Sequence, residues 1–407
     1  MKILQINKFY YERRGAESYF FDLQNLLESK GHQVIPFAMA DERNRKTPYE
    51  KYFVSQVDLV APRFALKDIQ KAGRVIYSFE AKRKIEKLIK AERPEIAHIH
   101  NIYHQLSPSI LPVFRKYHLP VVMTVHDFKL ICPNYSLFTE GKICERCRKH
   151  KYYEAIIHRC LKDSLAASAL ACVEMYLHHN LWQVYERYVD LFIAPSEFTK
   201  KKLVEWGMDA RKIKVLPHFV KLDEKKKLAN GEKYILYFGS LTAGKGVDVL
   251  LRAMQRNREI KLKIVGEGRE RKELETMAEA MNLNNVEFFG QKKREFLNQL
   301  IEGALFVVAP SRAYETFGLS ILESFARGKA VIATNLGSYP ELVHVGQTGL
   351  LFQNENAEDL ANKIKSLAQS SDLARQMGER TGSLARRAFN QEKHYEEILK
   401  IYRSLKK

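Results

Sequence analysis

Long hydrophobic runs are missing from this sequence of 407 residues. No segment has 18 uninterrupted apolar residues, whereas a bilayer-spanning helix needs about 20, so we expect no transmembrane helix. The longest apolar run, residues 165–177, is interrupted by Ser168 and Glu174 and predicts a buried or interfacial helix. The apolar run at residues 1–7 is too short for a signal peptide and predicts a first strand. We therefore expect a cytoplasmic protein that contacts a membrane, if at all, peripherally on the inner face of the plasma membrane.

The sequence also has no Asp-x-Asp pair, in which two nearby carboxylates could share a divalent cation. We therefore expect no catalytic Mg²⁺ or Mn²⁺ held in that way.

Cysteine is scarce, and four of the five cysteines fall in one insert at about residues 132–160. Their spacing, C-x11-C-x2-C-x12-C, allows a structural zinc site with four thiolate ligands, and the expected reducing compartment argues against disulfides. The alternative is a loop with reduced cysteines. The polar and basic residues between them cannot build a hydrophobic core, which favours the metal. The four candidate ligands are Cys132, Cys144, Cys147 and Cys160, and we expect Cys172 to be a packed thiol.

Positive charge is in excess, with a formal net charge of +19. Residues 1–216 contain 36 Lys and Arg against 24 Asp and Glu, so most of the excess lies in the first half. This balance predicts attraction to nucleic acid, anionic lipid or phosphate-bearing substrates. Basic residues recur with apolar ones over residues 82–93, which predicts either a helix lying on an anionic membrane or a solvated helix packed by its aliphatic side.

Short apolar runs alternate with helical patterns along the whole chain, which predicts an α/β fold of two Rossmann-like, doubly wound parallel domains facing each other across a cleft. We expect an N-terminal domain over residues 1–216 and a C-terminal domain over 217–390. The charged stretch 221–233 is the expected connection, and residues 391–407 form a last helix. Ligands of such sheets gather at the carboxyl ends of the strands.

The most informative segment runs from Pro310 to Glu323. A buried strand is expected before it, a turn at Phe317-Gly318, and then a helix whose first free N–H groups, near Gly318 and Leu319, make a phosphate cradle. Glu315 precedes the cradle, and Glu323 lies among apolar neighbours that we expect to be buried. A buried carboxylate needs donors, which ribose hydroxyls would supply. The alternative is an ordinary pair of surface glutamates.

Six motifs in order resemble the retaining family 4 glycosyltransferases, also called glycosyl transferases group 1, which have the GT-B fold. Glu315 and Glu323 are similar to the E-x7-E signature of that family. The other motifs are Arg14-Gly15-Ala16-Glu17, Val125-His126-Asp127, Phe238-Gly239 with Lys245-Gly246, Val265-Gly266-Glu267-Gly268, and Gly337-Ser-Tyr-Pro-Glu341.

The resemblance implies that residues 1–216 are the acceptor-side domain and that residues 217–390 bind the nucleotide sugar. It also implies that the last helix crosses back to the N-terminal domain, and it gives a role to each matching residue. Lys245 would neutralise the donor pyrophosphate, although Ser240 stands where the family has an arginine, and Arg312 could compensate. Glu315 would orient sugar hydroxyls, and His126 would contact the transferred sugar, unless it only caps the strand end. His98 and His100 are expected to fill positions at the sheet end. The implied donor-binding set is Gly15, Gly239, Ser240, Lys245, Gly266, Phe317, Gly318, Leu319 and Glu323, and the implied catalytic set is His126, Glu315 and Lys245.

The resemblance therefore implies a hexosyltransferase that moves a sugar, with retention, from a UDP- or GDP-sugar to a cell-surface polysaccharide or lipid-linked acceptor. A nucleotide-sugar hydrolase or epimerase of GT-B shape is the alternative within enzymes. A basic, zinc-containing nucleic-acid-binding protein is the alternative of another class. The spread of Lys and Arg over both halves, without a nucleic-acid motif, argues against it, and we expect no nucleic-acid partner.

Overall fold

The structure is a computed structural model that describes residues 1–13, 15–56, 72–222 and 233–406. Arg14 of the first motif and most of the expected connection therefore lie outside the described residues. The chain forms two compact units. Unit 1 comprises Met1–Thr139, Cys144–Pro217 and His394–Lys407, and unit 2 comprises Glu140–Ile143 and His218–Lys393. Among the described helices, none combines the length and the apolar composition that crossing a bilayer requires.

The sheet of unit 1 has six parallel strands in the order β2-β1-β3-β4-β7-β8. From β1 the chain moves to β2 on one side and then to β3 on the other, so the order reverses between β1 and β3. Ligands of open parallel sheets bind at the carboxyl ends of strands beside such a reversal. The strands are β1 Lys2–Ile6, β2 Gln33–Phe37, β3 Ile96–Ile99, β4 Val121–Thr124, β7 Leu191–Ala194 and β8 Ile213–Val215.

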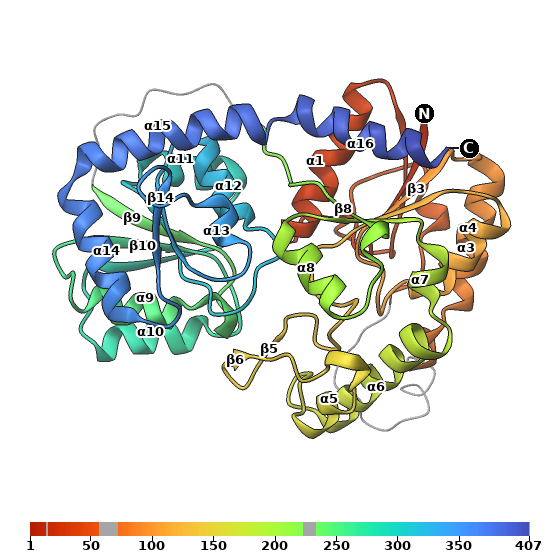
Figure 1. Ribbon diagram of the computed structural model, residues 1–407, viewed down its shortest axis with the longest axis horizontal. Helices are drawn as coiled ribbons and strands as arrows, with labels where there is room; N and C mark the ends of the chain where they lie inside the picture. Colours follow the sequence, from red (N-terminus) through yellow and green to blue (C-terminus); the bar gives the residue numbers. More distant parts are fainter. Residues whose placement is uncertain (14, 57–71, 223–232, 407) are drawn as a thin grey trace. The chain divides into compact units, whose positions relative to one another are not determined.

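Helices connect these strands, and a long insert follows β4 (Figure 1). The helices outside the insert are α1 Gly15–Ser29, α3 Phe79–Glu92, α4 Leu111–Lys116, α7 Val184–Tyr188, α8 Glu197–Glu205 and α16 Gln391–Leu405, with short 3-10 turns at Glu50–Tyr52, Pro108–Ile110 and Ala210–Lys212. The insert holds β5 Phe138–Thr139, β6 Lys142–Ile143, a 3-10 turn Arg148–His150, α5 Glu154–Ile157, α6 Leu165–Met175 and the π-helical turn η4 Tyr176–Leu181.

Helix α3 is the basic helix that the sequence predicts over residues 82–93. Its apolar residues Ala81, Ile85, Leu88 and Ile89 are buried in the core of unit 1. The aliphatic side of α3 is therefore packed against protein, as in the second of the two alternatives, and is not available to a membrane.

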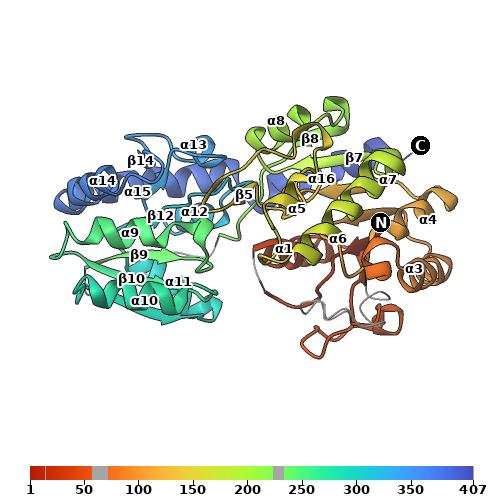
Figure 2. The ribbon, with the colours of Figure 1, turned by 90° about the horizontal axis from the view of Figure 1, so that it is seen from below.

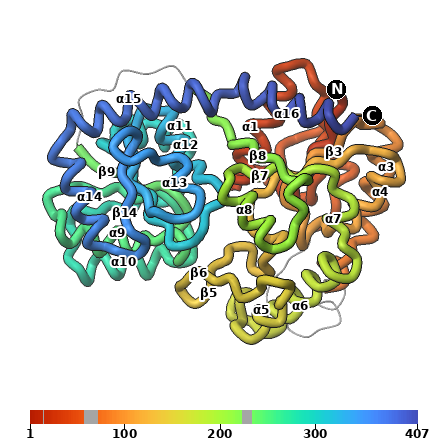
Figure 3. Tube along the Cα trace, viewed as in Figure 1, coloured from red at the N-terminus to blue at the C-terminus, as the bar shows by residue number. Residues whose placement is uncertain are grey.

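The last helix, α16, packs on unit 1 through aromatic residues (Figure 3). The Tyr402 hydroxyl lies 2.6 Å from His98 Nδ1 on β3, and Tyr395 lies 2.9 Å from His32 Nε2. Tyr402 is fully buried. These contacts tie the C-terminal end of the chain to the first sheet.

Unit 2 repeats the plan, with six parallel strands in the order β11-β10-β9-β12-β13-β14. Here the order reverses between β9 and β12. The strands are β9 Tyr234–Phe238, β10 Lys261–Val265, β11 Val286–Gly290, β12 Val307–Ala309, β13 Val331–Thr334 and β14 Gly349–Phe352.

Helices cover both faces of this second sheet, so its central strands β9 and β12 are apolar and buried throughout. In Figure 1, α9 and α10 lie on one side and α11 and α12 on the other. The two doubly wound parallel sheets confirm the predicted fold class. The helices are α9 Val247–Met254, α10 Arg271–Ala280, α11 Arg294–Gly303, α12 Leu319–Ala326, α13 Tyr339–Leu342, α14 Ala357–Gln369 and α15 Ser371–Ala388, with a 3-10 turn at Ala243–Lys245.

Candidate functional site

The loops after β9 and β12 lie side by side at the reversal point of unit 2. The amides of Arg312 and Ala313 donate to the Gly244 carbonyl at 2.9 and 3.0 Å. Gly246 adopts a φ of 68°, and a Cβ there would lie 2.0 Å from the Pro310 carbonyl oxygen. Only glycine permits this approach of two backbones, which explains the glycine after Lys245.

This approach brings together two residues that the sequence separates by 70 positions. Lys245 Nζ lies 2.6 Å from Glu315 Oε1, and the Ser311 hydroxyl donates to the same oxygen at 3.1 Å. The side chains of Lys245 and Glu315 are 31% and 22% exposed, so both remain accessible to a ligand. Two residues predicted to be catalytic therefore form one ion pair at the carboxyl ends of neighbouring strands.

Two buried phenols lie behind the Glu315 carboxylate. Burial, and then the charge of Glu315, raise the pKa of Tyr237 and of Tyr339 above the ordinary range. Both phenols are therefore neutral. Tyr237 donates to the Ser240 carbonyl at 2.9 Å, and the Tyr339 hydroxyl lies 3.1 Å from that of Ser311.

The turns after β9 and β10 touch through glycines. A Cβ on Gly266, whose φ is 151°, would lie 1.8 Å from the Gly239 carbonyl oxygen. The Gly239 amide donates to the Val265 carbonyl at 3.0 Å. Gly239 and Gly266, both predicted to bind the donor, thus lie next to each other, and the backbone packing alone already explains why position 266 is glycine.

Helix α12 begins where the sequence predicts the phosphate cradle. Its N-cap is Gly318, with a φ of 110°, and a Cβ there would lie 2.8 Å from a ring carbon of Tyr339. The amides of Ile321 and Leu322 donate to the Gly318 carbonyl. The amides at the start of a helix have no helical carbonyl ahead of them, so those of Leu319 and Ser320 can serve an anion. Phe317 is buried and anchors the turn.

Glu323 is only half-buried, which corrects the expectation that it is largely buried. Its neighbours Leu322 and Phe325 are fully buried, as expected. At about 100° per residue, position 323 lies about 100° from Leu322 and about 160° from Phe325, so it is turned away from the face that these two residues bury. The carboxylate is therefore within reach of a ligand.

Arg312, expected to compensate for Ser240, is already engaged by acidic side chains. Its Nε lies 2.7 Å from Glu355 and its Nη1 lies 3.4 Å from Asp248. Because two carboxylates share its charge, Arg312 offers less to a pyrophosphate than Lys245 does.

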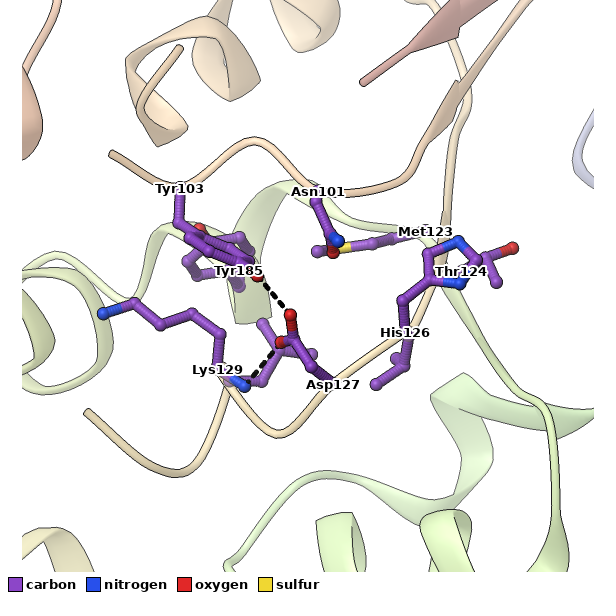
Figure 4. Close-up of a pocket in the computed structure, with 10 residues that line it drawn as sticks. Asn101, Tyr103, Met123, Thr124, His126, Asp127, Lys129 and Tyr185 are labelled. Atoms are coloured by element: carbon purple, nitrogen blue, oxygen red, sulfur yellow. Dashed lines mark hydrogen bonds between the residues drawn. The ribbon is translucent and has the colours of Figure 1, made fainter. Parts of the chain in front are cut away.

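In unit 1, a small pocket lies at the carboxyl ends of β3 and β4 (Figure 4). His126 lines it, together with Asp127, whose carboxylate accepts hydrogen bonds from the Tyr103 hydroxyl and, at 2.9 Å, from the Lys129 amide. Asp127 therefore caps this loop. The full lining is Asn101, Tyr103, Met123, Thr124, Val125, His126, Asp127, Lys129, Leu130 and Tyr185.

Three stacked histidines set the protonation of His126. The rings of His98, His100 and His126 stack with centroids 4.5 and 5.1 Å apart. Burial lowers the pKa of His98 and of His126 to about 3, so both rings are neutral. The Gln5 amide nitrogen faces His100 Nε2 at 3.3 Å, and His100 Nδ1 lies 2.8 Å from His126 Nε2.

This chain of contacts fixes the tautomers. An amide nitrogen only donates, so His100 accepts at Nε2 and carries its proton on Nδ1. His100 Nδ1–H then donates to His126 Nε2, which leaves the His126 proton on Nδ1. His126 is therefore a neutral hydrogen-bond donor, and its Nε2 is not free to act as a base.

Lys8 and Tyr103 are residues of this region that the sequence reasoning missed. Lys8 Nζ lies 3.6 Å from the centroid of the Tyr103 ring. Burial lowers the pKa of Lys8 to about 8, opposed by the charges of Asp127 and Glu17. Their positions in the sequence could have revealed them, because Lys8 follows β1 and Tyr103 follows β3, the two strands at the reversal point.

Gly15, predicted to bind the donor, is exposed at the start of α1.

The four cysteines of the insert lie close together. Burial, followed by the neighbouring thiols, raises the pKa of Cys147 and brings that of Cys132 to about 11. The Cys132 thiol donates to Asn134 Oδ1 at 2.9 Å. Within the described ranges, no group of three or more His, Cys, Asp or Glu side chains is arranged to hold a metal ion. The zinc site therefore stays a prediction.

Two doubly wound parallel units with glycine-rich turns at their strand ends define the GT-B class of glycosyltransferase folds. Comparison with known proteins agrees. The Glycosyltransferase Family 4 model matches residues 13–224, and the Glycosyl transferases group 1 model matches residues 220–383. The chain belongs to family 4 of the glycosyltransferases.

Among curated relatives, an uncharacterized glycosyltransferase of Methanocaldococcus jannaschii, MJ1178, is 33% identical over 42% of this chain and 48% of its own length. The matched stretch thus spans about half of that relative. An uncharacterized 42.6 kDa protein in the cps region of Klebsiella pneumoniae is 24% identical over 85% of this chain and 88% of its own length.

Solved structures share the fold over nearly the whole chain. Sucrose-phosphate synthase from Thermosynechococcus elongatus has a TM-score of 0.74 at 19% identity, covering 99% of this chain and 98% of its own. HepE of Anabaena, in complex with UDP and glucose, has a TM-score of 0.71 at 19% identity, covering 99% and 100%.

Proposed function

We propose that this protein is a hexosyltransferase that moves a sugar, with retention, from a nucleotide-diphosphate sugar to a glycan or lipid-linked acceptor. The observation that carries the proposal is the Lys245–Glu315 pair, 2.6 Å apart, at the reversal point of unit 2. A cation, a carboxylate and the N-terminus of α12 together suit a ligand with both a pyrophosphate and hydroxyl groups. The HepE structure with UDP and glucose supports a UDP-sugar as one candidate donor.

Each group of the pair has a separate task in this proposal. The pyrophosphate recruits the Lys245 ammonium away from Glu315, because it carries more negative charge than one carboxylate. Glu315 is then released to accept hydrogen bonds from sugar hydroxyls. The amides of Leu319 and Ser320 and the turns at Gly239 and Gly266 bind the phosphates, and Glu323 accepts from the ribose.

The proposal assigns no protein nucleophile. The acceptor hydroxyl attacks the anomeric carbon, the bond to the phosphate oxygen breaks, and that departing oxygen takes the acceptor proton on the same face. His126 contributes a neutral Nδ1–H to the transferred sugar and removes no proton. Gly15 leaves space for the ligand at the start of α1. The proposed acceptor suits the basic first half, since lipid-linked and surface glycan precursors carry phosphates, and it suits a cytoplasmic site of action at the membrane surface.

Thermal shift with a panel of UDP-, GDP- and ADP-sugars tests the donor. One base and sugar should raise the melting temperature, since a ligand at about 1,000 times its Kd adds roughly 4 kcal/mol. Product analysis by NMR with the selected donor should then show transfer with the anomeric configuration retained. Consumption of the donor without any acceptor would instead indicate a hydrolase or epimerase. Retention on DNA above moderate salt, with no sugar nucleotide bound, would indicate the nucleic-acid-binding alternative.

Glu323→Ala should weaken binding of the nucleoside diphosphate without preventing folding. A charge-assisted hydrogen bond is worth about 1.5–3 kcal/mol, and half-exposure places the expected loss near the lower end, roughly tenfold in Kd. Isothermal titration with UDP or GDP measures it. Glu379→Ala on α15, an exposed glutamate paired with Arg375, is the matched control. Equal affinity for wild type and Glu323→Ala would remove the ribose assignment.

A further inference from the structure

Helix α6 and the turn η4 bury polar side chains while large apolar ones stay exposed. Four large apolar side chains face solvent along this segment, namely Leu165 (57% exposed), Val173 (47%), Tyr176 (56%) and Leu181 (60%). The buried side carries Ser168, Glu174, His178 and His179 alongside Ala171 and Met175. A surface helix ordinarily has the opposite arrangement, with its apolar stripe toward the core.

A buried polar network holds α6 in this orientation. Glu174 is 1% exposed and lies 2.8 Å from Lys129 Nζ and 3.2 Å from His104 Nε2. His178 Nε2 lies 2.8 Å from the Ile76 carbonyl oxygen. Rotating α6 to bury its apolar side would pull the Glu174 carboxylate away from the buried Lys129 ammonium, which would lose its partner. The exposed apolar side is therefore part of the fold.

Helix α5 extends the same apolar surface. Figures 1 and 2 both show α5 beside α6, and α5 contributes Ile157, which is 64% exposed, with Tyr153 just before it at 51%. We call this surface the apolar face; its members are Tyr153, Ile157, Leu165, Val173, Tyr176 and Leu181. The exposed large apolar residues of unit 2, in contrast, lie singly on separate elements. A cluster of exposed apolar side chains on adjacent helices marks an interaction site.

The charges around the apolar face identify its partner. Residues 165–183 contain no Lys or Arg, and their one carboxylate is the buried Glu174. The preceding residues 148–163 carry exposed basic side chains against only Glu154 and Asp163. These basic residues are Arg148, Lys149, Lys151, Arg159 and Lys162. Apolar side chains with tyrosines, bordered by exposed lysines and arginines, match the boundary between the headgroups and acyl chains of an anionic bilayer.

A second copy of the chain fits this face less well. In a twofold dimer the same surface meets itself, so the two basic borders would be brought together and repel each other. A layer of anionic lipid instead supplies negative charge opposite the border and a nonpolar phase opposite the helices.

We propose that the apolar face docks on the surface of an anionic lipid bilayer. The side chains of α5, α6 and η4 enter the headgroup region, and the basic border contacts lipid phosphates. The surface lies outside the residues assigned to sugar transfer, so docking and catalysis can be tested separately.

Vesicle co-sedimentation of the full chain is the test. Wild type should bind vesicles of phosphatidylcholine with phosphatidylglycerol, and bind weakly to phosphatidylcholine alone or at high salt. The triple variant Leu165→Ser, Val173→Ser, Tyr176→Ser should lose about tenfold or more in partitioning, because it removes apolar area that enters the bilayer. These side chains are exposed, so circular dichroism should be unchanged. Phe296→Ser, Val345→Ser, Leu373→Ser on unit 2 is the matched control and should bind as wild type does.

Lys149→Glu with Lys151→Glu should abolish the salt-sensitive part of binding. Three outcomes would overturn the proposal: no binding by wild type, equal binding by the triple variant and wild type, or equal binding to neutral and anionic vesicles. If wild type self-associates without binding vesicles and the triple variant does not self-associate, the apolar face is an interface with a second copy of the chain. That result would also overturn the proposal.

Discussion

Lys245→Ala should lower kcat by roughly 100- to 1,000-fold with an intact sugar donor, the usual cost of removing one group that stabilises charge in the transition state. The departing pyrophosphate gains negative charge as the sugar leaves. Ser240 supplies no fixed charge there, and Arg312 is shared by Glu355 and Asp248. Lys245 is thus the cation with most charge to give, and steady-state kinetics with the donor found by the panel measures the loss.

Conservative and compensating variants separate charge from structure. Lys245→Arg keeps the positive charge and should retain much of the rate, whereas Ser240→Arg should leave activity intact or raise it. Lys363→Ala, a lysine on α14 that lies 3.9 Å from Asp359, removes an ion pair of unit 2 outside the site and should change nothing. Near-normal turnover by Lys245→Ala would mean that the pyrophosphate is held elsewhere.

The turns of unit 2 were predictable because they depend on local chemistry. Glycine at positions 246, 266 and 318 is required by a positive φ and by the lack of space for a Cβ, which would meet backbone at 246 and 266 and the Tyr339 ring at 318. Local chemistry also explains why the sequence around Pro310 to Glu323 predicted a strand, a turn and a helix in succession. The resemblance assigned Lys245 and Glu315 to the same site. It did not predict that they form an ion pair, because 70 residues separate them in the sequence.

The orientation of α6 could not be read from the sequence. Its apolar residues occur all round the helix, so their period does not show which side faces the core. The contact between Glu174 and Lys129 decides it, and that contact joins residues 45 apart on different elements. The burial of Glu323 was wrong for a related reason, because apolar neighbours in sequence are not neighbours on the same face of a helix.

The stacked histidines show the same limit in unit 1. His98 and His100 were expected at the sheet end, and they lie there. Their effect on His126 depends on β3 and β4 being adjacent, and on Gln5 from β1 fixing the proton of His100. Three strands distant in sequence thus determine one tautomer.

Acid should destabilise unit 1 steeply between pH 6 and pH 4.5. Burial lowers the pKa of several buried histidines, to about 3 for His98 and His126 and to about 4 for His178 and His394. The ordinary value, expected in the unfolded chain, is about 6.5. Below that value the unfolded state binds protons that the folded state does not, so stability falls as pH falls.

The expected slope is large compared with the stability of a domain. Each of these four histidines contributes up to about 1.4 kcal/mol per pH unit, or about 5.6 kcal/mol for the four together, against a typical total of about 5–15 kcal/mol. Burial also raises the pKa of Glu17, so the folded state takes up this one proton more readily than the unfolded state. That proton offsets part of the loss of stability in acid. Both tryptophans, Trp182 and Trp206, belong to unit 1, so urea unfolding followed by their fluorescence measures the slope for this unit.

The variant His394→Asn removes one of the buried histidines that take up a proton only on unfolding. The His394 ring lies 3.0 Å from the Pro217 carbonyl oxygen through Nδ1, a contact that an asparagine amide can also make. The variant should be less stable at pH 7 but should lose about one quarter of the slope, because one neutral histidine no longer opposes protonation. His118→Asn, at an exposed position with a φ of 49° that asparagine tolerates, is the control and should keep the full slope. If His394→Asn kept the full slope as well, protonation of buried histidines would not be the cause of acid unfolding in unit 1.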